Sequence, residues 1–354
     1  MTTLQALDIP FYVGTNHAPG KQNGILRSSI DTETGKISPP VPAADVSGPS
    51  FLAVSADGRF LYAAIEKAGG EVAAFKIEAD RSLSPLNSKS AGGKGTCHVW
   101  ADTAHIFASN YTGGNVTCLS LLPDGSLGEE RANIAFTGSG PNPGRQQKPF
   151  AHGAVSSADG RFVYVCDLGS DQVWIFRFDR SSGAMVPADP PAAKVPAGGG
   201  PRHPALSPGG DFLYVNNEMG MSVSAFARNA ATGALSLIQT IPTLPEGSSK
   251  EGATTSGLVI HPGGKWLYVS NRGHNSITVY GVQPDGTLKF IQNAPSVVEM
   301  PREFSIDPSG TWLVAGGQKD GAIASMRING TDGTLTVADR IDTGAVPVSF
   351  SFLP

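Results

Sequence analysis

Short runs of apolar residues recur along the whole chain, and the same order of apolar, polar and turn residues returns at a period of about fifty residues. The fullest copies are SADGRFLYAAIE from residue 55, SADGRFVYVCDL from 157, SPGGDFLYVNNE from 207, HPGGKWLYVSNR from 261 and DPSGTWLVAGGQ from 307. A shortened copy, ADTAHIFASNY from residue 101, lacks the glycine turn. Such a period indicates a repeat architecture in which each repeat is one supersecondary unit.

Each copy predicts four strands. An apolar strand leads into an Asp-Gly or Gly-Gly turn, which suits a two-residue hairpin, and a second strand of the type Phe-Leu-Tyr-Val follows. A third strand alternates apolar and polar residues, as in EVAAFKIE, QVWIFRFD and SITVYGVQ, and a turn such as PDGSL or TDGTL leads to a weaker fourth strand. Four antiparallel strands that are repeated radially form the blades of a β-propeller.

The two ends of the chain complete one further blade. The chain opens in mid-repeat, with FYVGTN (11–16) as a second strand, GILRSSID (24–31) as a third and ISPPVPA (37–43) as a fourth, and it closes with VPVSFSFLP (346–354), which matches a first strand. We therefore predict an all-β fold: a seven-bladed propeller of four-stranded antiparallel blades, one of them closed by both termini, with residues 1–354 as a single domain. Closure of this kind removes exposed sheet edges.

Composition and charge narrow the class of protein further. The 44 Gly, 27 Pro and 16% charged residues fit a chain of many strands and turns. A net charge of −4 provides no basic field for nucleic acid or an anionic membrane, and no apolar run is long enough to span a bilayer. The start, MTTLQALDIPFYVG, lacks the pattern of a secretory signal. We expect a cytoplasmic protein with reduced, buried thiols at Cys97, Cys118 and Cys166; the sequence does not define an oligomeric state, and a monomer is compatible with it.

Polar and charged residues, which cost free energy when they are buried, gather at one end of the predicted hairpins. The start of a first strand lies beside the end of the second strand, and the first strands should line the central channel, so all these ends surround one mouth. The aligned repeats place nine candidate side chains there: His152, Arg202 and Arg302 at the starts of first strands, Glu218, Arg272 and Gln318 at the ends of second strands, and Asn110, Asp167 and Asn217 one position earlier.

Four of these residues come from three consecutive blades and should converge: His152, Arg202, Glu218 and Arg272. General acid–base catalysis needs a histidine and a carboxylate whose pKa values a partly buried site can move. Arginines can bind phosphate or carboxylate with two parallel hydrogen bonds and can stabilise a developing oxyanion. We expect His152 and Glu218 to be catalytic and the other candidates to bind substrate. Glu218 could instead form a structural ion pair with one arginine while the other binds substrate.

The ring of Asn110, Asp167, Asn217 and Asn271 could in principle hold Ca²⁺ or Mg²⁺ through oxygen atoms. Only one of the four is a carboxylate, however, and Asn or Asp at a strand end usually caps the next loop, so we expect no metal. His98 and His203 follow the first-strand position by one residue, and we expect them to alternate away from the first set and either to support the site residues or to pack in the interior.

The residues around the mouth resemble a known family. The segments KPFAHGA around His152, GPRHPA around Arg202, NNE ending at Glu218 and SNRG around Arg272 are similar to the seven-bladed-propeller lactonase family, which includes bacterial 6-phosphogluconolactonases and fungal carboxy-cis,cis-muconate lactonizing enzymes. The resemblance implies a histidine–glutamate acid–base pair and two arginines for anionic groups of the substrate, without a metal or other cofactor. The loops 138–147 and 243–255 lie next to the predicted mouth and could reshape its pocket.

We therefore expect a lactonase that hydrolyses a small sugar-acid lactone, with 6-phosphogluconolactone as the leading substrate. A muconate-type lactonizing enzyme is the near alternative, because the same four groups could support proton transfer to or from a dicarboxylate. A propeller that binds a protein partner without catalysis is the alternative from another class, since one fold hosts many functions. The concentration of ionisable residues on one sector of one mouth favours an enzyme.

Overall fold

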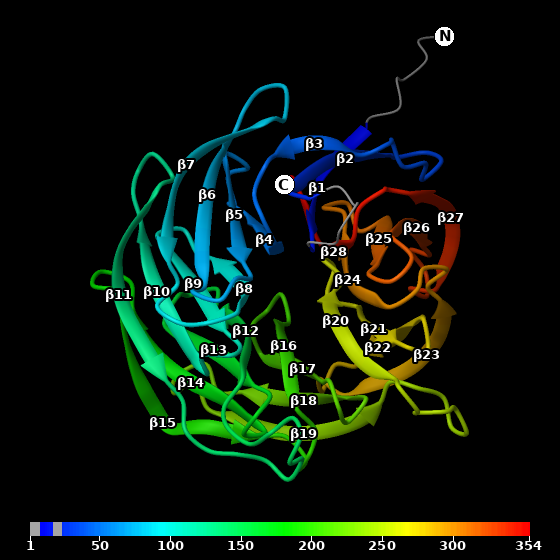
Figure 1. The fold of residues 1–354 in the computed structure, drawn as a ribbon. Coiled ribbons are helices and arrows are strands. Elements are labelled where there is room, and N and C mark those ends of the chain that lie inside the picture. Colours follow the sequence, from blue (N-terminus) through cyan, green and yellow to red (C-terminus); the bar gives the residue numbers. More distant parts are fainter. Residues whose placement is uncertain (1–7, 17–22) are drawn as a thin grey trace.

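Seven four-stranded antiparallel sheets surround a central axis (Figure 1), which confirms the predicted propeller. This computed structural model describes residues 8–16 and 23–354. The innermost strands contact their counterparts in the neighbouring blades. They are β4 (Pro49–Val54), β8 (Thr96–Ala101), β12 (Ala151–Ser156), β16 (Pro201–Leu206), β20 (Thr254–Ile260), β24 (Pro301–Ile306) and β28 (Pro347–Phe352). No helix in the described part of the chain is long and apolar enough to cross a membrane.

The other strands follow outward within each blade. The second strands are β1 (Asp8–Thr15), β5 (Phe60–Ile65), β9 (His105–Asn110), β13 (Phe162–Asp167), β17 (Phe212–Asn217), β21 (Trp266–Arg272) and β25 (Trp312–Gly317). The third strands are β2 (Ile25–Asp31), β6 (Glu71–Ile77), β10 (Asn115–Leu121), β14 (Gln172–Asp179), β18 (Ser222–Arg228), β22 (Ser276–Val282) and β26 (Ala322–Ile328). The outer strands are β3 (Val41–Ala44), β7 (Leu83–Ser90), β11 (Leu127–Ala135), β15 (Ala184–Lys194), β19 (Leu235–Pro242), β23 (Leu288–Pro295) and β27 (Leu335–Asp342).

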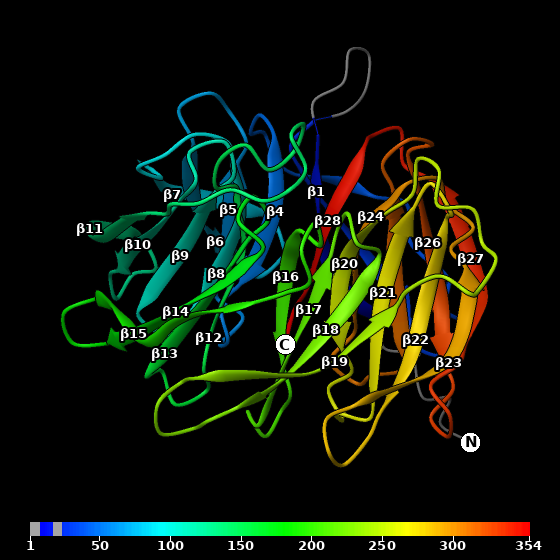
Figure 2. The ribbon, with the colours of Figure 1, turned by 90° about the horizontal axis from the view of Figure 1, so that it is seen from below.

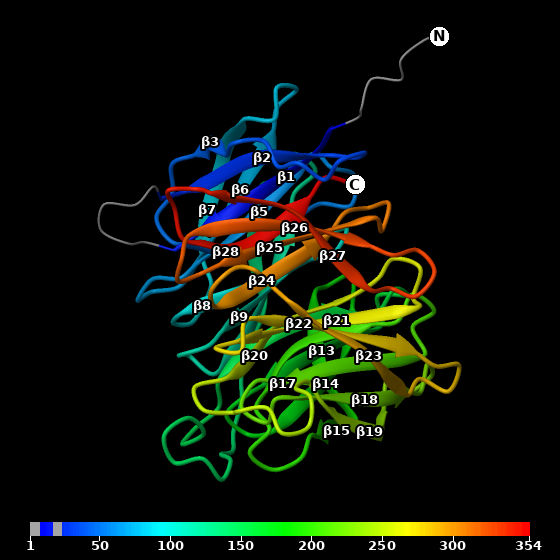
Figure 3. The same ribbon diagram turned by 90° about the vertical axis from the view of Figure 1, so that its right-hand side faces the viewer.

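The two ends of the chain share one blade, as predicted. β28 pairs antiparallel with β1, and Figure 2 shows the red and dark-blue strands side by side. Figure 3 shows this blade next to the orange and red blade of β24–β27. The outer strand β3 begins later than the predicted residue 37, and Ile37 forms only an isolated bridge with Ile30. Pro39 and Pro40 interrupt the pairing because proline has no backbone N–H to donate.

The repeated Phe-Leu-Tyr motif locks neighbouring blades together. In the blade of β4–β7, the hydroxyl of buried Tyr62 donates a hydrogen bond to the carbonyl oxygen of Gly125, 3.1 Å away in the turn between β10 and β11 of the next blade. The ring of Phe60 covers the same glycine, and a Cβ on Gly125 would lie 2.2 Å from that ring. The same bond joins Tyr164 to Gly233, Tyr214 to Gly286 and Tyr268 to Gly333. Each buried aromatic side chain contributes about 1.5–3 kcal/mol of burial free energy, so the motif stabilises the contact between neighbouring blades.

A β-bulge or similar irregularity recurs where the innermost strands begin. The pairing of β12 with β13 shifts between Ala151 and Ala154, and the pairing of β16 with β17 shifts between Pro201 and Pro204. Similar shifts occur at the starts of β4, β8, β20 and β24. A bulge bends the strand and redirects its side chains. The residues at these shifts, including His152, Arg202 and His203, therefore do not follow the simple alternation of a regular strand.

Candidate active site

Arg202 and Glu218 form the centre of the site. Arg202 lies in the bulge at the start of β16, and Glu218 directly follows β17 of the same blade. Nε of Arg202 is 3.1 Å from Oε2 of Glu218, and the two residues are only 2% and 4% exposed. Nη1 of Arg202 also donates a hydrogen bond to the carbonyl oxygen of Ser256 in the next blade, 2.6 Å away. Arg202 therefore joins two blades, because it pairs with Glu218 in its own blade and donates to Ser256 in the next one.

Two further arginines surround the other oxygen of Glu218. Nη2 of Arg272, the last residue of β21, is 3.2 Å from Oε1, and Nη2 of Arg145 donates a hydrogen bond to the same oxygen at 2.7 Å. Burial by itself would raise the pKa of Glu218, but Arg272, Arg202 and Arg145 outweigh it and lower that pKa to about 2. Glu218 is thus an ionised carboxylate and, in this arrangement, a very weak base.

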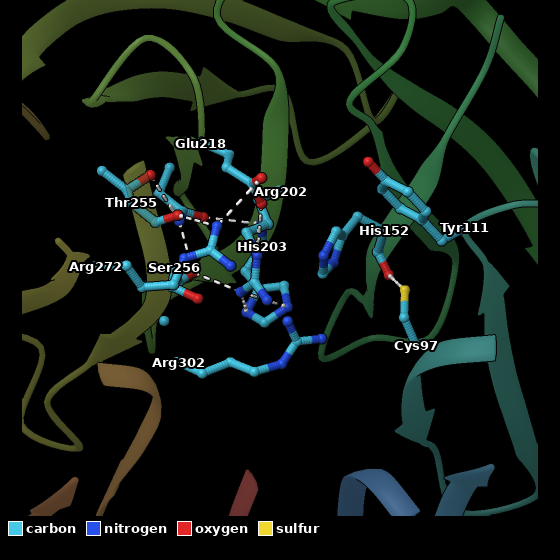
Figure 4. A network of polar contacts seen from close by, with 12 residues as sticks. Cys97, Tyr111, His152, Arg202, His203, Glu218, Thr255, Ser256, Arg272 and Arg302 are labelled. Atoms are coloured by element: carbon cyan, nitrogen blue, oxygen red, sulfur yellow. Dashed lines mark hydrogen bonds and ion pairs between the residues drawn. The ribbon is translucent and has the colours of Figure 1, made fainter. Parts of the chain in front are cut away.

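His152 faces this cluster from β12. Figure 4 shows the His152 ring turned toward Arg202 and His203, with Tyr111 beside it. Its ring centroid lies 5.0 Å from that of His203 and 5.6 Å from that of Tyr111. Burial and the charge of Arg202 hold the pKa of His152 well below its ordinary value. Nδ1 of His152 is buried and has no hydrogen-bond partner among the described residues, so the neutral imidazole keeps a free polar atom in the site.

His203 and Glu303 are the remaining members of the cluster, and both contact Arg202. Nδ1 of His203 is 3.3 Å from Oε2 of Glu303, and Nη1 of Arg202 lies 3.3 and 3.2 Å from the two ring nitrogens of His203. Burial raises the pKa of Glu303 to about 7, although Arg202 opposes the shift. His203 supports Arg202 and packs against Phe51, as expected of a supporting or packing residue, but it does not alternate away from Arg202, because the pairing of β16 shifts after Pro201. His98 does behave as a packing residue, with its ring 4.2 Å from Phe51.

Arg302 reaches the same space from a third side (Figure 4). Its side chain is 16% exposed, and its nearest carboxylate is that of Glu66, with Nη2 and Oε2 separated by 3.9 Å. Its positive charge contributes to lowering the pKa of Arg202 to about 10, where burial is the larger cause. Arg302 is therefore a cation of the site that is only loosely paired.

The structure does not bring the predicted ring of amide and carboxylate groups into the cluster. The carboxylate of Asp167 accepts hydrogen bonds from Phe150 N–H and Gly169 N–H at 2.7 and 3.0 Å. Asn110 accepts a hydrogen bond from Thr96 Oγ1, and Asn217 donates to the hydroxyls of Ser222 and Ser224. All three are fully buried, because a position one residue earlier in a strand points to the other face of the sheet.

Gln318 lies just after β25 and is partly exposed, and its backbone N–H donates to the carbonyl oxygen of Met300. Within residues 8–16 and 23–354, no group of three or more His, Cys, Asp or Glu side chains could hold a metal ion. The innermost strands also line a cavity of about 310 Å³. His98, His203 and Glu303 are among the residues that line it. A larger hollow of about 620 Å³, lined by His261, Lys265 and Arg327 among others, contains none of the predicted site residues.

Sequence reasoning missed Arg145 as a member of the cluster. Arg145 belongs to the loop 138–147, which was expected to border the mouth but has no counterpart in the other repeats. Glu303 follows Arg302 in the segment PREF, where the sequence left open whether the two residues extend the site or pair with each other; the structure places Glu303 in the cluster, at the bulge after Pro301. A second charged residue next to a predicted site position was the available signal in both bulges.

Comparison with known proteins identifies the family of this chain. The model of the family "Lactonase, 7-bladed beta-propeller" matches residues 10–352. A 6-phosphogluconolactonase of Bacillus subtilis (strain 168) is 32% identical over 348 residues, which cover 97% of both chains. The crystal structure of a putative 6-phosphogluconolactonase from Bacteroides fragilis NCTC 9343 has a TM-score of 0.91 at 30% identity and full coverage of both chains. That of a periplasmic gluconolactonase from Pseudomonas aeruginosa has a TM-score of 0.90 at 25% identity, covering 98% of this chain and 99% of that one. The chain therefore belongs to the seven-bladed β-propeller lactonase family and is a lactone-hydrolysing enzyme.

Proposed function

We propose that this protein hydrolyses 6-phosphogluconolactone by general acid–base catalysis at the cluster around Glu218, without a metal ion. The names of the relatives from Bacillus subtilis and Bacteroides fragilis support the substrate. The excess of arginines over carboxylates in the cluster supports an anionic substrate of this kind. Since the substrate carries a phosphate, we retain the cytoplasmic location as part of the proposal, although one similar protein is periplasmic.

The observation that carries the proposal is the free, buried Nδ1 of His152 opposite a carboxylate that three arginines hold ionised. A general base must be unprotonated at the working pH, and the lowered pKa of His152 keeps its imidazole neutral. Glu218 is a poorer candidate for the base, because both of its oxygens are already paired with arginines whereas Nδ1 of His152 has no partner among the described residues. We assign Glu218 the task of holding Arg202 and Arg272 beside the lactone carbonyl.

The reaction then takes two steps. His152 removes a proton from a water molecule while the oxygen of that water attacks the carbonyl carbon of the lactone. This step yields a tetrahedral oxyanion and an imidazolium. Collapse of the oxyanion breaks the bond to the ring oxygen, and the imidazolium returns the proton to that leaving oxygen. Nε of Arg272 is buried and has no hydrogen-bond partner in the described part of the chain, so it is a suitable donor for the oxyanion.

A panel of substrates tests the proposal. Freshly generated 6-phosphogluconolactone, glucono-δ-lactone and a muconolactone are offered to the protein, and products are followed by NMR with the uncatalysed rate subtracted. We expect the fastest turnover with the phosphorylated lactone. Conversion of the muconolactone alone would assign the lactonizing alternative. Absence of turnover with all three would contradict the proposed substrate class and favour a propeller that binds without catalysis.

A further inference from the structure

Two of the arginines around Glu218 are already committed to protein groups. Arg202 uses its guanidinium on Glu218 and the carbonyl oxygen of Ser256, and its side chain is only 2% exposed. Arg272 contacts Glu218 and the carbonyl oxygen of Thr255, and its side chain is 12% exposed. These two side chains are buried and have few hydrogen-bond donors left for a bulky dianion such as a phosphate.

Arg145 differs from both because it enters from outside the strands. Its side chain is 43% exposed, and its Nη2 bridges two groups, Oε1 of Glu218 at 2.7 Å and the hydroxyl of Tyr111 at 3.1 Å. Tyr111 in turn lies against His152. Arg145 therefore bridges Glu218 and Tyr111, the neighbour of His152, at the exposed side of the cluster.

The loop that carries Arg145 is held firmly. Gln146, which is fully buried, donates hydrogen bonds to the carbonyl oxygen of Leu168 at 2.8 Å and to Oδ1 of Asp171 at 2.7 Å. Oδ1 of Asn142 accepts hydrogen bonds from the N–H groups of Gly144 and Arg145 at 3.0 and 3.1 Å. The backbone of Arg145 is thus fixed by buried contacts, while its guanidinium stays free to exchange one anionic partner for another.

The charges of the cluster favour an anion. Four guanidiniums, those of Arg145, Arg202, Arg272 and Arg302, face the carboxylates of Glu218 and Glu303 and, more loosely, that of Glu66. Arg145 is the most exposed of the four, at 43%, and the planar fork of arginine matches the oxygens of a phosphate. A phosphate bound beside Arg145 would offset the positive charge of the cluster.

We propose that Arg145 binds the phosphate of the substrate and gives this site its preference for a phosphorylated lactone. The inference rests on the proposed function and names the residue that selects the substrate. Phosphate binding draws the guanidinium from Oε1 of Glu218, where the ligand and the carboxylate compete for the same Nη2. Arg145 is then a recognition residue whose contact with Glu218 marks the site in its unliganded state.

The test compares Arg145→Ala and Arg145→Lys with a matched control, Arg180→Ala. Arg180 is also 43% exposed and forms an ion pair of 2.9 Å with Asp102, which lies at the opposite end of the blades, next to the turn between β8 and β9. We expect Arg145→Ala to lower the ratio of kcat/KM for 6-phosphogluconolactone over glucono-δ-lactone by about 10- to 100-fold, the loss that fits removal of a charged hydrogen bond. The ratio for Arg145→Lys should lie between those of the wild type and Arg145→Ala, since lysine keeps the positive charge but lacks the planar fork of arginine. Arg180→Ala should leave the ratio unchanged.

Binding of the product separates the inference from the proposed function. Calorimetry with 6-phosphogluconate and gluconate needs no turnover, and we expect Arg145→Ala to weaken only the phosphorylated ligand. An equal loss of kcat/KM for both lactones, or 6-phosphogluconate binding that is absent or independent of Arg145, would overturn the inference. If the wild type hydrolyses neither lactone but binds 6-phosphogluconate through Arg145, the proposed function fails and the anion site stands.

Discussion

Nε of Arg202 lies 3.1 Å from Oε2 of Glu218, and both side chains are almost completely buried at the mouth of the propeller. A buried ion pair lowers stability when one partner is removed, since the other is left as an uncompensated charge. Arg202 also contacts Ser256 in the next blade, and Glu218 also contacts Arg272 there. The pair therefore supports both the seam between two blades and the chemistry of the site.

Glu218→Gln should lower the free energy of unfolding at pH 7 by about 3–5 kcal/mol, the usual cost of breaking a buried pair. The pKa of Glu218 is about 2 in the folded protein, below its ordinary value of 4.5, so its contribution is present above pH 4.5 and is lost as the pH falls toward 2. Urea unfolding at pH 7 and at lower pH measures both effects. An equal difference between wild type and variant at pH 7 and pH 3 would contradict this assignment.

Glu303→Gln should change the pH dependence of stability in the opposite sense. The pKa of Glu303 is raised to about 7 by burial, so the folded state binds a proton more tightly than the unfolded state between pH 4.5 and about 7. The wild type should therefore lose stability relative to the variant as the pH rises through this range. The difference between the two unfolding curves reports Glu303 together with His203, since Nδ1 of His203 lies 3.3 Å from the carboxylate. A pH-independent difference would show that Glu303 has an ordinary pKa.

Gly153→Ala should disturb the seam between β12 and β16. A Cβ at this position would lie 2.7 Å from both the carbonyl oxygen of Arg202 and Cδ of Pro204. We expect a loss of about 1–3 kcal/mol in the free energy of unfolding, as for overpacking in a core, with lower activity because His152 and Arg202 are displaced. Gly330→Ala is the matched control, since a Cβ there meets no described atom within 4 Å. Equal stability of the two variants in urea would show that the seam tolerates the methyl group.

Much of this molecule could be predicted from sequence because the repeat carries its own alignment. The Phe-Leu-Tyr strands and glycine turns recur since each blade uses the same tyrosine-to-glycine bond to hold the next one. The two ends of the chain matched the missing strands of one blade, and β28 pairs with β1 as expected. Arg202, Glu218, His152 and Arg272 lie together because hairpin geometry places strand starts beside strand ends.

The errors have two physical causes. A bulge breaks the alternation of side chains in β16, so His203 turned into the cluster although a regular strand would have directed it away. Where alternation does hold, it carries Asn110, Asp167 and Asn217 into the interior of their blades, where they bond to neighbouring backbone and hydroxyl groups. Arg145 escaped notice because the loop 138–147 has no equivalent in the repeat and therefore no register to read.

The central claim is that His152 is the base of a lactone hydrolysis. The most direct test compares wild type with His152→Ala on freshly generated 6-phosphogluconolactone, with the uncatalysed rate subtracted and with folding checked by circular dichroism. We predict a wild-type rate well above background that falls by a factor of about 10² or more in the variant, the contribution expected of a general base. A folded His152→Ala protein that keeps the wild-type rate would contradict the account.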